Sequence, residues 1–181
     1  MAAVPEVFNQ PGAGFVLLPK GIKFPPLEDG WQKPEKAHTF HEATAHRGNV
    51  GILAGNGFIG LDQDDPTAFE GLELPTATKW ETRPGRFGMW FKVSGDVPAA
   101  LGRIGKKPDQ AQLYLFKDGK PCGEIKLQRT YQVIPPSWKI LEGGARGDYK
   151  LANRASFMAP IPSFSVSPES TMPYSFILPS E

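Results

Sequence analysis

Residues 49–65, NVGILAGNGFIGLDQDD, constrain the fold of this 181-residue chain more than any other stretch. Two apolar runs surround the sequence Gly55-Asn56-Gly57, and Asn-Gly between such runs is a strong signal for a hairpin, because both residues tolerate positive φ. Side chains alternate along a strand, so Asp62 and Asp64 are expected on one face, about 6–7 Å apart. Two like charges at that spacing repel each other, and a divalent cation with oxygen ligands commonly relieves the repulsion. The stretch therefore predicts two strands joined by a tight turn, with a candidate metal platform at the end of the second.

The composition is that of an ordinary globular domain and excludes several classes of function. The 19 prolines and 20 glycines indicate many short elements joined by turns. The net charge of +1 leaves a polyanionic partner open, so any nucleic-acid contact depends on a local basic surface. Cys122 is the single cysteine, which excludes an internal disulfide and a multi-cysteine zinc site. No apolar run approaches the ~18 residues of a membrane span and no leader-like segment begins the chain, so we expect a soluble, cytoplasmic protein without a membrane partner.

Apolar runs bounded by proline and glycine predict a succession of short strands with a few short helices. In the run EIKL, Glu124 and Lys126 share one face while Ile125 and Leu127 share the other, which is typical of a sheet packed on one side. The order of elements predicts an α/β (α+β) fold with a mixed β-sheet and short flanking helices. Strands are expected at residues 14–18, 78–81, 87–93, 111–116, 124–127 and 131–134, and helices near residues 38–46, 66–71 and 96–104.

Three histidines and Asp65 are further candidates for a functional role, and each has an explanation that needs no catalysis. His38 and His41 are three residues apart and can share a helical face. A metal pair is weighed against surface or structural roles for these two and for His46, since no acidic or cysteine partner lies at a supporting spacing. Asp65 precedes Pro66, and Asp at the N-cap followed by Pro at the first helical position is a common helix start.

Several motifs follow one another along the chain. They are a Lys-Phe-Pro-Pro…Gly-Trp loop at residues 23–31, an N-x-G-x-x-x-G pattern from Asn49 that leads to the D-x-D strand, a T-R-x-G turn from Thr82, an acidic strand at Glu124, and Val-Ile-Pro-Pro-Ser at residues 133–137. Their order and spacing resemble the bifunctional DNA primase/polymerase (Prim-Pol) domain of plasmid and viral replication proteins, within the archaeo-eukaryotic primase superfamily. The likeness covers about residues 14–162.

The resemblance implies a fold and a division of the chain into segments. It implies a mixed catalytic domain with an RRM-like sheet at residues 14–162. Outside this range the expectations rest on composition. Residues 1–13 are weakly patterned and rich in Ala, Pro and Gly, so a loosely ordered N-terminus is expected there, and a Pro/Ser-rich C-terminal segment or linker is expected at residues 163–181.

The resemblance also implies an activity. Such domains copy DNA, and many also start chains, using nucleoside triphosphates and two divalent ions, Mg²⁺ or Mn²⁺. The paired acids of the family fall on Asp62 and Asp64, its third acid falls on Glu124, and Lys126 matches a basic position just after that acid. The implied partners are a DNA template and primer and a helicase domain or protein, and we expect a monomer. A polar strand end remains the alternative for the two aspartates, and a surface ion pair with a lysine the alternative for Glu124.

One position departs from the family pattern. The family usually has a histidine that contacts the incoming triphosphate in a middle strand, and Gly88 occupies the equivalent place here. Arg83 and Arg86 in the adjacent turn are candidate replacements, because a guanidinium grips phosphate oxygens bidentately, although a solvated turn is equally compatible with their positions. A catalytically inactive relative, which binds nucleotide or single-stranded nucleic acid within a replication initiator, is therefore the alternative function.

Two residues of the loop at residues 23–31 are candidate nucleic-acid contacts. Lys23 suits a phosphate contact or a solvated charge, and Trp31 suits base stacking or a lid over the core. An RRM-like RNA binder is a third hypothesis. The carboxylates argue against it, because they repel phosphates.

Overall fold

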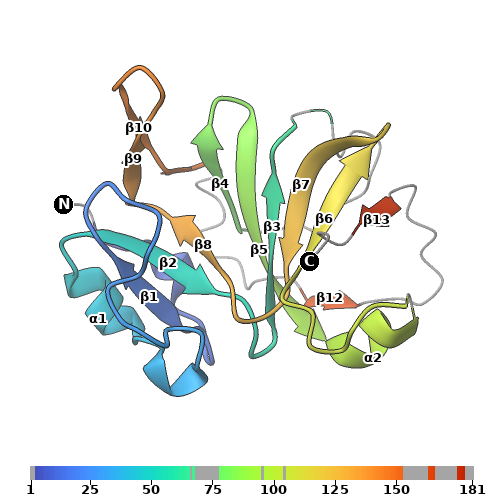
Figure 1. The fold of residues 1–181 in the computed structure, drawn as a ribbon. Coiled ribbons are helices and arrows are strands. Elements are labelled where there is room, and N and C mark those ends of the chain that lie inside the picture. The colour runs from blue at the N-terminus through green and yellow to red at the C-terminus, as the bar shows by residue number, and fades with distance from the viewer. Residues whose placement is uncertain are drawn as a thin grey trace.

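The computed structural model describes residues 3–65, 67, 78–94, 96–103, 105–152, 163–165 and 175–177 (Figure 1). Short strands dominate these residues, which confirms the predicted α+β fold class, whereas the RRM-like arrangement of the sheet stays a prediction. The strands are β1 (Phe15–Leu18), β2 (Asn49–Leu53), β3 (Phe58–Gln63), β4 (Thr78–Arg83), β5 (Arg86–Ser94), β6 (Gln112–Lys117), β7 (Lys120–Lys126), β8 (Tyr131–Ile134), β9 (Trp138–Ile140), β10 (Arg146–Asp148), β11 (Lys150–Leu151), β12 (Ser163–Ser165) and β13 (Ser175–Ile177). The helices are α1 (Phe40–Ala45) and α2 (Val97–Arg103), with 3₁₀ turns η1 (Glu6–Phe8) and η2 (Pro34–Lys36).

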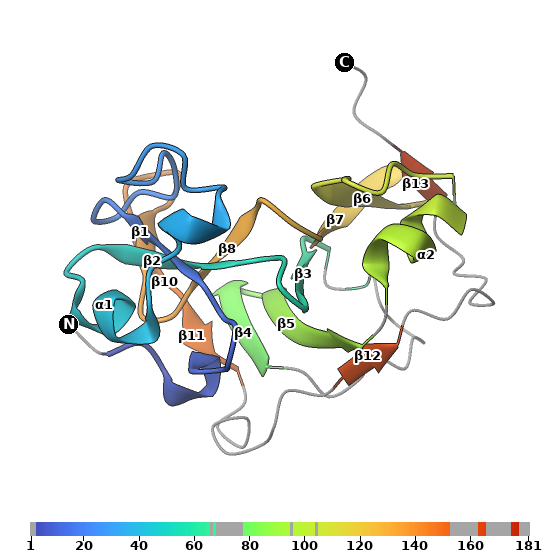
Figure 2. The same cartoon turned by 90° about the horizontal axis from the view of Figure 1, so that it is seen from below.

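The strands form two sheets that pack against each other. The smaller sheet has the order β1-β2-β8, and the larger has the order β11-β4-β5-β3-β7-β6-β13, with β12 pairing beside β5. β9 and β10 form a separate hairpin. Figure 2 shows the smaller sheet and α2 on opposite sides of the larger sheet. Within the larger sheet, β3 pairs with β5 on one side and with β7 on the other, so its acidic end is flanked by strands on both sides.

The Gly55-Asn56-Gly57 turn is formed as predicted, but the strands around it do not pair as a hairpin. All three residues have positive φ, at 114°, 50° and 84°. Beyond a single bridge between Gly55 and Phe58, the two strands diverge, β2 into the smaller sheet and β3 into the larger. The hairpin prediction was wrong in this respect, because each strand is buried between two other partners, β1 and β8 for β2, and β5 and β7 for β3.

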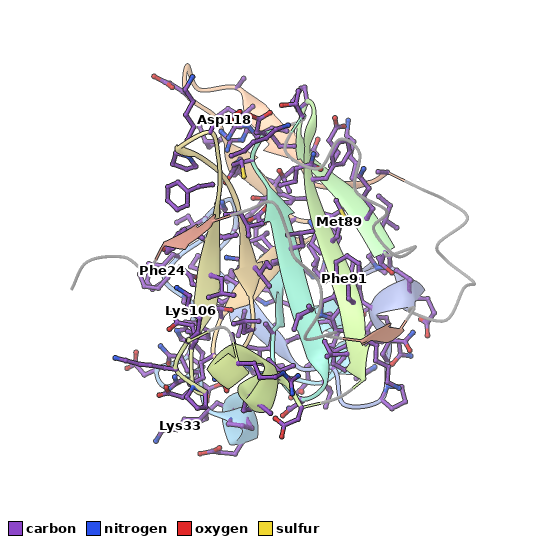
Figure 3. All side chains as sticks on the ribbon, turned by 90° about the vertical axis from the view of Figure 1, so that its right-hand side faces the viewer. Phe24, Lys33, Met89, Phe91, Lys106 and Asp118 are labelled. Atoms are coloured by element: carbon purple, nitrogen blue, oxygen red, sulfur yellow. The ribbon has the colours of Figure 1, made fainter. Side chains whose placement is uncertain are left out.

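Side-chain alternation gives the larger sheet two buried faces. Trp80 and Trp90 project toward the smaller sheet and form a first core with Phe8, Phe15 and Ile52. The opposite face forms a second core beneath α2, and Figure 3 shows Met89 and Phe91 projecting from β5 on that side. Members of the second core include Leu61, Leu101, Leu113 and Leu115.

The N-terminal segment packs into the first core, which differs from the loose docking expected from its composition. Val4, Val7 and Phe8 are buried, and the Phe8 ring lies 5.5 Å from the ring of Trp80. Three apolar side chains within five residues were enough to anchor a segment that the high content of Ala, Pro and Gly had suggested to be weakly ordered.

Some predictions fall at the edge of the described residues or beyond it. The predicted helix at residues 66–71 lies outside them except for Thr67, whose backbone N donates to Asp65 Oδ1 at 2.8 Å, as expected for a capping aspartate. The Pro/Ser-rich C-terminal segment is described only at β12 and β13. Among the described helices, none combines the length and the apolar character of a membrane span.

Candidate active site

Strand β3 carries Asp62 to the middle of the larger sheet. Asp62 lies directly opposite Glu124 of β7 on one side and Gly88 of β5 on the other. Residues that face each other across antiparallel strands project to the same side, so the Asp62 and Glu124 side chains share a face. Leu61 and Ile125 project to the other face, into the second core. The fold thus brings together two of the three carboxylates singled out by the sequence.

The surroundings of Asp62 disfavour its ionised form. Burial raises the pKa of the Asp62 carboxyl above its ordinary value, and the nearby charges of Glu124 and Asp64 act in the same direction. Lys126 and Lys23 oppose this shift because their positive charges favour the carboxylate. A half-buried carboxylate beside two other acids gains from the approach of a further cation.

Asp64 lies just beyond the end of β3 and is exposed. Its Oδ1 atom accepts a hydrogen bond from Arg86 Nη1 at 3.1 Å and lies 3.7 Å from Arg83 Nη2. Both arginines belong to the tight turn between β4 and β5, where Gly85 has a φ of 72°. Such exposed pairs contribute only about 0–1 kcal/mol each, so a ligand can exchange them at little cost.

Glu124 is also paired with a cation of its own chain. Lys126 Nζ donates to Glu124 Oε1, and both side chains are largely buried. This is the ion pair that the sequence offered as the alternative to a catalytic role for Glu124. Glu124 and Lys126 project to one side of β7 because they are two residues apart on a strand, and Asp62, which lies opposite Glu124, projects to that side too.

The three carboxylates do not converge into a ready-made metal site. Across the described ranges, no three or more His, Cys, Asp or Glu residues lie close enough together to hold a metal ion. The donor set still fits Mg²⁺ or Mn²⁺, because both are hard cations that take carboxylate oxygens. Closure on a cation requires Asp64 and Glu124 to exchange their present partners, Arg86 and Lys126.

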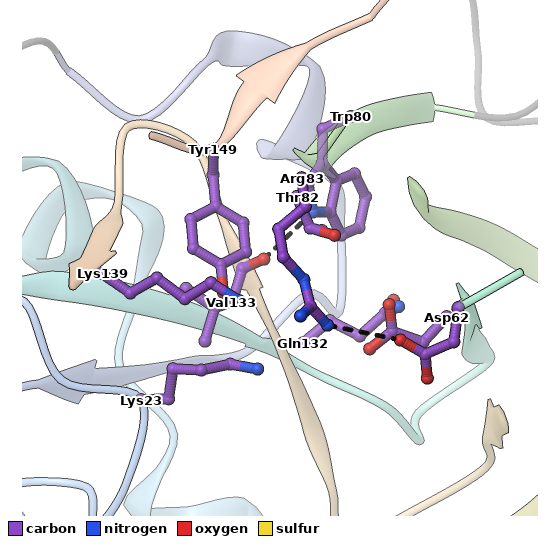
Figure 4. Close-up of a pocket in the computed structure, with 10 residues that line it drawn as sticks. Lys23, Asp62, Trp80, Thr82, Arg83, Gln132, Val133, Lys139 and Tyr149 are labelled. Atoms are coloured by element: carbon purple, nitrogen blue, oxygen red, sulfur yellow. Dashed lines mark hydrogen bonds and ion pairs between the residues drawn. The ribbon is translucent and has the colours of Figure 1, made fainter. Parts of the chain in front are cut away.

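Asp62 and Asp64 line a polar pocket of about 40 Å³, which is room for a few water molecules (Figure 4). Lys23 and Lys139 lie across this pocket from Asp62 in Figure 4. Cations thus face acids across a small space, which suits a polyanion bound together with divalent ions. The pocket is lined by Lys23, Asp62, Asp64, Trp80, Thr82, Arg83, Gln132, Val133, Lys139 and Tyr149.

Lys139 is a pocket residue that the sequence analysis missed. Burial lowers the pKa of its ammonium to about 8, and the positive charges of Lys23 and Arg83 lower it further in the same direction. Like charges gathered around one space favour an anionic ligand there. Lys139 lies two residues after the serine of the Pro-Pro-Ser motif, and this position was the only signal in the sequence that pointed to it.

Two buried polar atoms in the pocket wall are without a hydrogen-bond partner. They are Gln132 Oε1 and the Tyr149 hydroxyl, in residues that are 5% and 4% exposed. The other end of the Gln132 amide is fixed, because Nε2 donates to the Leu61 carbonyl at 3.0 Å. Gln132 also packs closely over Gly60, where a Cβ would lie 2.3 Å from Oε1. Neither residue was predicted, since only the pairing of the sheets brings them to Asp62.

The place at which the resemblance leads one to expect a histidine is filled by another side chain. A Cβ on Gly88 would lie 2.4 Å from the indole of Trp80, which covers this glycine from the neighbouring strand. Trp80 is fully buried and its Nε1 donates to the Val133 carbonyl at 3.0 Å. Position 88 therefore has no space for a histidine while Trp80 keeps this position.

The two predicted nucleic-acid contacts have different surroundings. Lys23 lines the pocket, and its backbone carbonyl accepts a hydrogen bond from the Tyr131 hydroxyl. Trp31 packs edge-on against the Tyr131 ring, with 4.9 Å between the ring centroids, and is half-buried. Nucleic-acid binding by either residue stays a prediction.

The three histidines lie away from this site. His38 Nε2 is 3.2 Å from Glu28 Oε2, and His46 Nε2 is 2.9 Å from the Leu18 carbonyl oxygen. His41 is exposed on α1, and none of the three belongs to the described lining of the pocket. These positions favour the surface and structural roles over a histidine metal pair.

Most of the chain matches a known protein family. The family model described as "Bifunctional DNA primase/polymerase, N-terminal" (Prim-Pol) matches residues 6–164, which is most of the chain. No curated protein gives a significant match.

Proposed function

The chain belongs to the bifunctional DNA primase/polymerase family, and on this premise we propose that it is a metal-dependent nucleotidyltransferase that extends DNA. The proposed substrates are nucleoside triphosphates and a primed DNA template, and the proposed cofactor is a pair of Mg²⁺ or Mn²⁺ ions. The observation that carries this proposal is the direct pairing of Asp62 with Glu124, beside a pocket that also holds Arg83 and two lysines.

The roles of the carboxylates follow from where charge develops. Nucleotidyl transfer places negative charge on the attacking 3′-oxygen, the transferred phosphate and the departing pyrophosphate, and two divalent ions about 3.5–4 Å apart neutralise both ends of this reaction. We assign Asp62 and Asp64 as shared ligands and Glu124 as a ligand nearer the primer terminus. The sheet holds Asp62 and Glu124 in register, whereas Asp64 lies beyond the strand end, where its side chain lines the pocket and pairs with Arg86.

The cationic side chains are assigned to the triphosphate. Arg83, Arg86 and Lys126 are the candidates from the sequence, and Lys139 joins them because it lines the pocket together with Arg83. If Arg83 and Arg86 bind the triphosphate, they leave Asp64, whose carboxylate can then bind a metal ion. The arginines and the carboxylate thus each keep a partner of opposite charge. This arrangement supports triphosphate binding without the family histidine.

The biological setting is a further part of the proposal. By family likeness, the chain acts in the replication of a plasmid or virus, with DNA template and primer as partners and a helicase domain or protein nearby. It acts as a monomer in this account.

A second candidate function is supported by one observation. Asp64 and Glu124 are each paired with a cation of the chain, and the described residues contain no ready three-acid group. In this alternative the protein is a catalytically inactive relative that binds nucleotide or single-stranded nucleic acid within a replication initiator.

Primer extension with labelled nucleotide in Mg²⁺ or Mn²⁺ separates the two candidates. We expect metal-dependent extension by the wild-type chain, and Asp62→Asn should abolish it while DNA binding remains. Asp118→Asn is the matched control, because Asp118 has a φ of 52° at the β6–β7 turn, where Asn is equally well accommodated. If the wild-type chain incorporates nothing with either ion yet binds nucleotide or DNA, the inactive relative is the correct assignment.

A further inference from the structure

The ion pair between Glu124 and Lys126 leaves one charge without a partner when Glu124 turns to a metal ion. Lys126 Nζ donates to Glu124 Oε1, and the two side chains are only 20% exposed for Glu124 and 11% for Lys126. An ammonium can only donate, and a buried charge that loses its partner strongly destabilises a fold. Metal binding by Glu124 therefore requires a second acceptor within reach of Lys126.

Such an acceptor lies over the residue directly opposite Lys126. Gly60 of β3 pairs with Lys126 of β7, so the space above Gly60 and the Lys126 side chain are on the same face of the larger sheet. The Gln132 amide fills that space, because a Cβ on Gly60 would lie 2.3 Å from Gln132 Oε1. Opposite residues have Cβ atoms about 4.5–5.5 Å apart, a distance that the four methylenes of a lysine can span.

The orientation of the Gln132 amide is fixed by its other end. Nε2 donates to the Leu61 carbonyl at 3.0 Å, and a flipped amide would set Oε1 against that carbonyl oxygen. Oε1 itself has no partner, in a side chain that belongs to a residue only 5% exposed. The other buried side-chain atoms left unpaired in the described part of the chain are hydroxyls and an indole N–H, which can donate. Gln132 Oε1 can only accept, so it is the complement of an ammonium.

The neighbour of Gly60 on the other side does not use this acceptor. Trp90 of β5 also pairs with Gly60, but its indole stacks on Phe58, with 4.3 Å between the ring centroids. Trp90 Nε1 and Gln132 Oε1 are both without a partner, so they do not bond each other. The acceptor over Gly60 thus stays open while Lys126 is paired with Glu124.

We propose that Gln132 is a positioning residue, whose Oε1 atom takes up the Lys126 ammonium when Glu124 turns to a divalent cation. This exchange rests on the proposed metal binding by Glu124, and it keeps both charged groups paired throughout. Gln132 acts on Glu124 through Lys126 and contacts neither the metal ion nor the nucleotide. Lys126 stays beside Asp62 after the exchange, because Gly60 and Asp62 share one face of β3.

Titration of the full chain with Mn²⁺, followed through the electron paramagnetic resonance of the free ion, tests the exchange by a double-mutant cycle. Gln132→Met keeps the size of the side chain and removes the acceptor, so it should weaken Mn²⁺ binding by about tenfold or more, the usual worth of a hydrogen bond to a charged group. Lys126→Met leaves no ammonium to take up, so Gln132→Met should not change Mn²⁺ affinity in that background. Gln110→Met is the matched control and should bind Mn²⁺ as wild type, because Gln110 Nε2 also donates to a backbone carbonyl, at 2.9 Å, but outside the described lining of the pocket.

A second cycle needs no metal ion. Glu124→Ala removes the present partner of Lys126, so the ammonium should move to Gln132 in that variant. Gln132→Met should then lower the free energy of unfolding by more than it does in the wild type. Urea denaturation of the wild type, the two single variants and the double variant measures the difference.

Three results would overturn the exchange. Equal weakening of Mn²⁺ binding by Gln132→Met with and without Lys126 would mean that the amide acts on the ion or on β3 directly. Unchanged Mn²⁺ binding by Gln132→Met, or equal costs of Gln132→Met with and without Glu124, would mean that Lys126 does not move to it.

The proposed polymerase function fails separately from the exchange. A chain that shows both couplings but extends no primer would keep the exchange and lose only its catalytic assignment. A chain that extends primers while Gln132→Met acts independently of Lys126 would keep its activity and lose the exchange. A wild-type chain that binds no Mn²⁺ would overturn both.

Discussion

Among the described carboxyl groups with a shifted pKa, Asp62 is the one whose pKa is raised. Burial raises the pKa of its carboxyl, so in the unliganded chain the ionised form is held at a cost to folding. Removal of that charge should therefore stabilise the protein even as it removes the proposed activity. A gain of this kind at a functional position is typical of sites that exchange stability for function.

We predict that Asp62→Asn raises the free energy of unfolding by about 1 kcal/mol at neutral pH, as measured by urea denaturation without divalent ions. Because the pKa of Asp62 is raised in the folded state, its ionised form destabilises the wild-type fold above that pKa, and this destabilisation disappears as the pH falls through it. The stability gained by Asp62→Asn should therefore shrink in acid. Asp64→Asn, at an exposed carboxylate paired with Arg86, should give no gain. A loss of stability in Asp62→Asn at neutral pH would contradict this description of the site.

The residues of the site differ in how readily the sequence reveals them. Asp62 could be predicted because it follows an apolar strand pattern, which fixes the face of its side chain. Glu124 was predicted through the family resemblance, and the alternation in the run EIKL fixes its face. Gln132 and Tyr149 could not be predicted, because they carry no motif and reach the pocket only through the pairing of β8 with β2 and the fold of the β9–β10 hairpin. Lys139 had only its place shortly after the Pro-Pro-Ser motif to indicate it.

At the scale of elements, β4 and β5 are matched to each other through Trp80 and Gly88. The indole of Trp80 lies over Gly88, so the glycine is needed for close packing and not for an unusual backbone angle. This pair supports the floor of the pocket, because Trp80 also donates to the Val133 carbonyl. The same pair removes the space that the family histidine would need.

We predict that Gly88→Ala destabilises the chain by about 1–3 kcal/mol, the usual cost of overpacking a core. In a Trp80→Leu background, where the smaller side chain leaves room above residue 88, Gly88→Ala should lower the free energy of unfolding by less than it does in the wild type. Denaturant unfolding of the single and double variants measures this coupling. Gly102→Ala in α2 is the control, because a Cβ there meets nothing within 4 Å and alanine favours a helix, so a small gain is expected. A neutral Gly88→Ala would show that Trp80 moves freely.

The strands also show where local sequence reasoning ends. The Gly55-Asn56-Gly57 turn was predictable from its residue types, because positive φ is a local property. The separation of β2 and β3 into different sheets was not, since it depends on partners from β1, β5, β7 and β8. Local signals thus placed the turn and both strands, and left their pairing open.

At the scale of the whole molecule, the candidate site exists only where the two sheets meet. Asp62 comes from the larger sheet, Gln132 from the smaller sheet, Lys139 from the β9–β10 hairpin, and Lys23 from the loop after β1. The two aspartates of the pocket therefore lie on one side of it, and its two lysines lie on the other. Divalent ions and a triphosphate are the ligands that satisfy both sets of charges together.

Crystals soaked with Mn²⁺ and a non-hydrolysable nucleoside triphosphate test this account most directly, through the anomalous signal of the metal. The account predicts two Mn²⁺ peaks about 3.5–4 Å apart, bound by Asp62, Asp64 and Glu124, with Arg83 or Arg86 turned from Asp64 to the triphosphate. Peaks elsewhere, or a triphosphate bound while Glu124 keeps Lys126 and no metal joins Asp62, would contradict it.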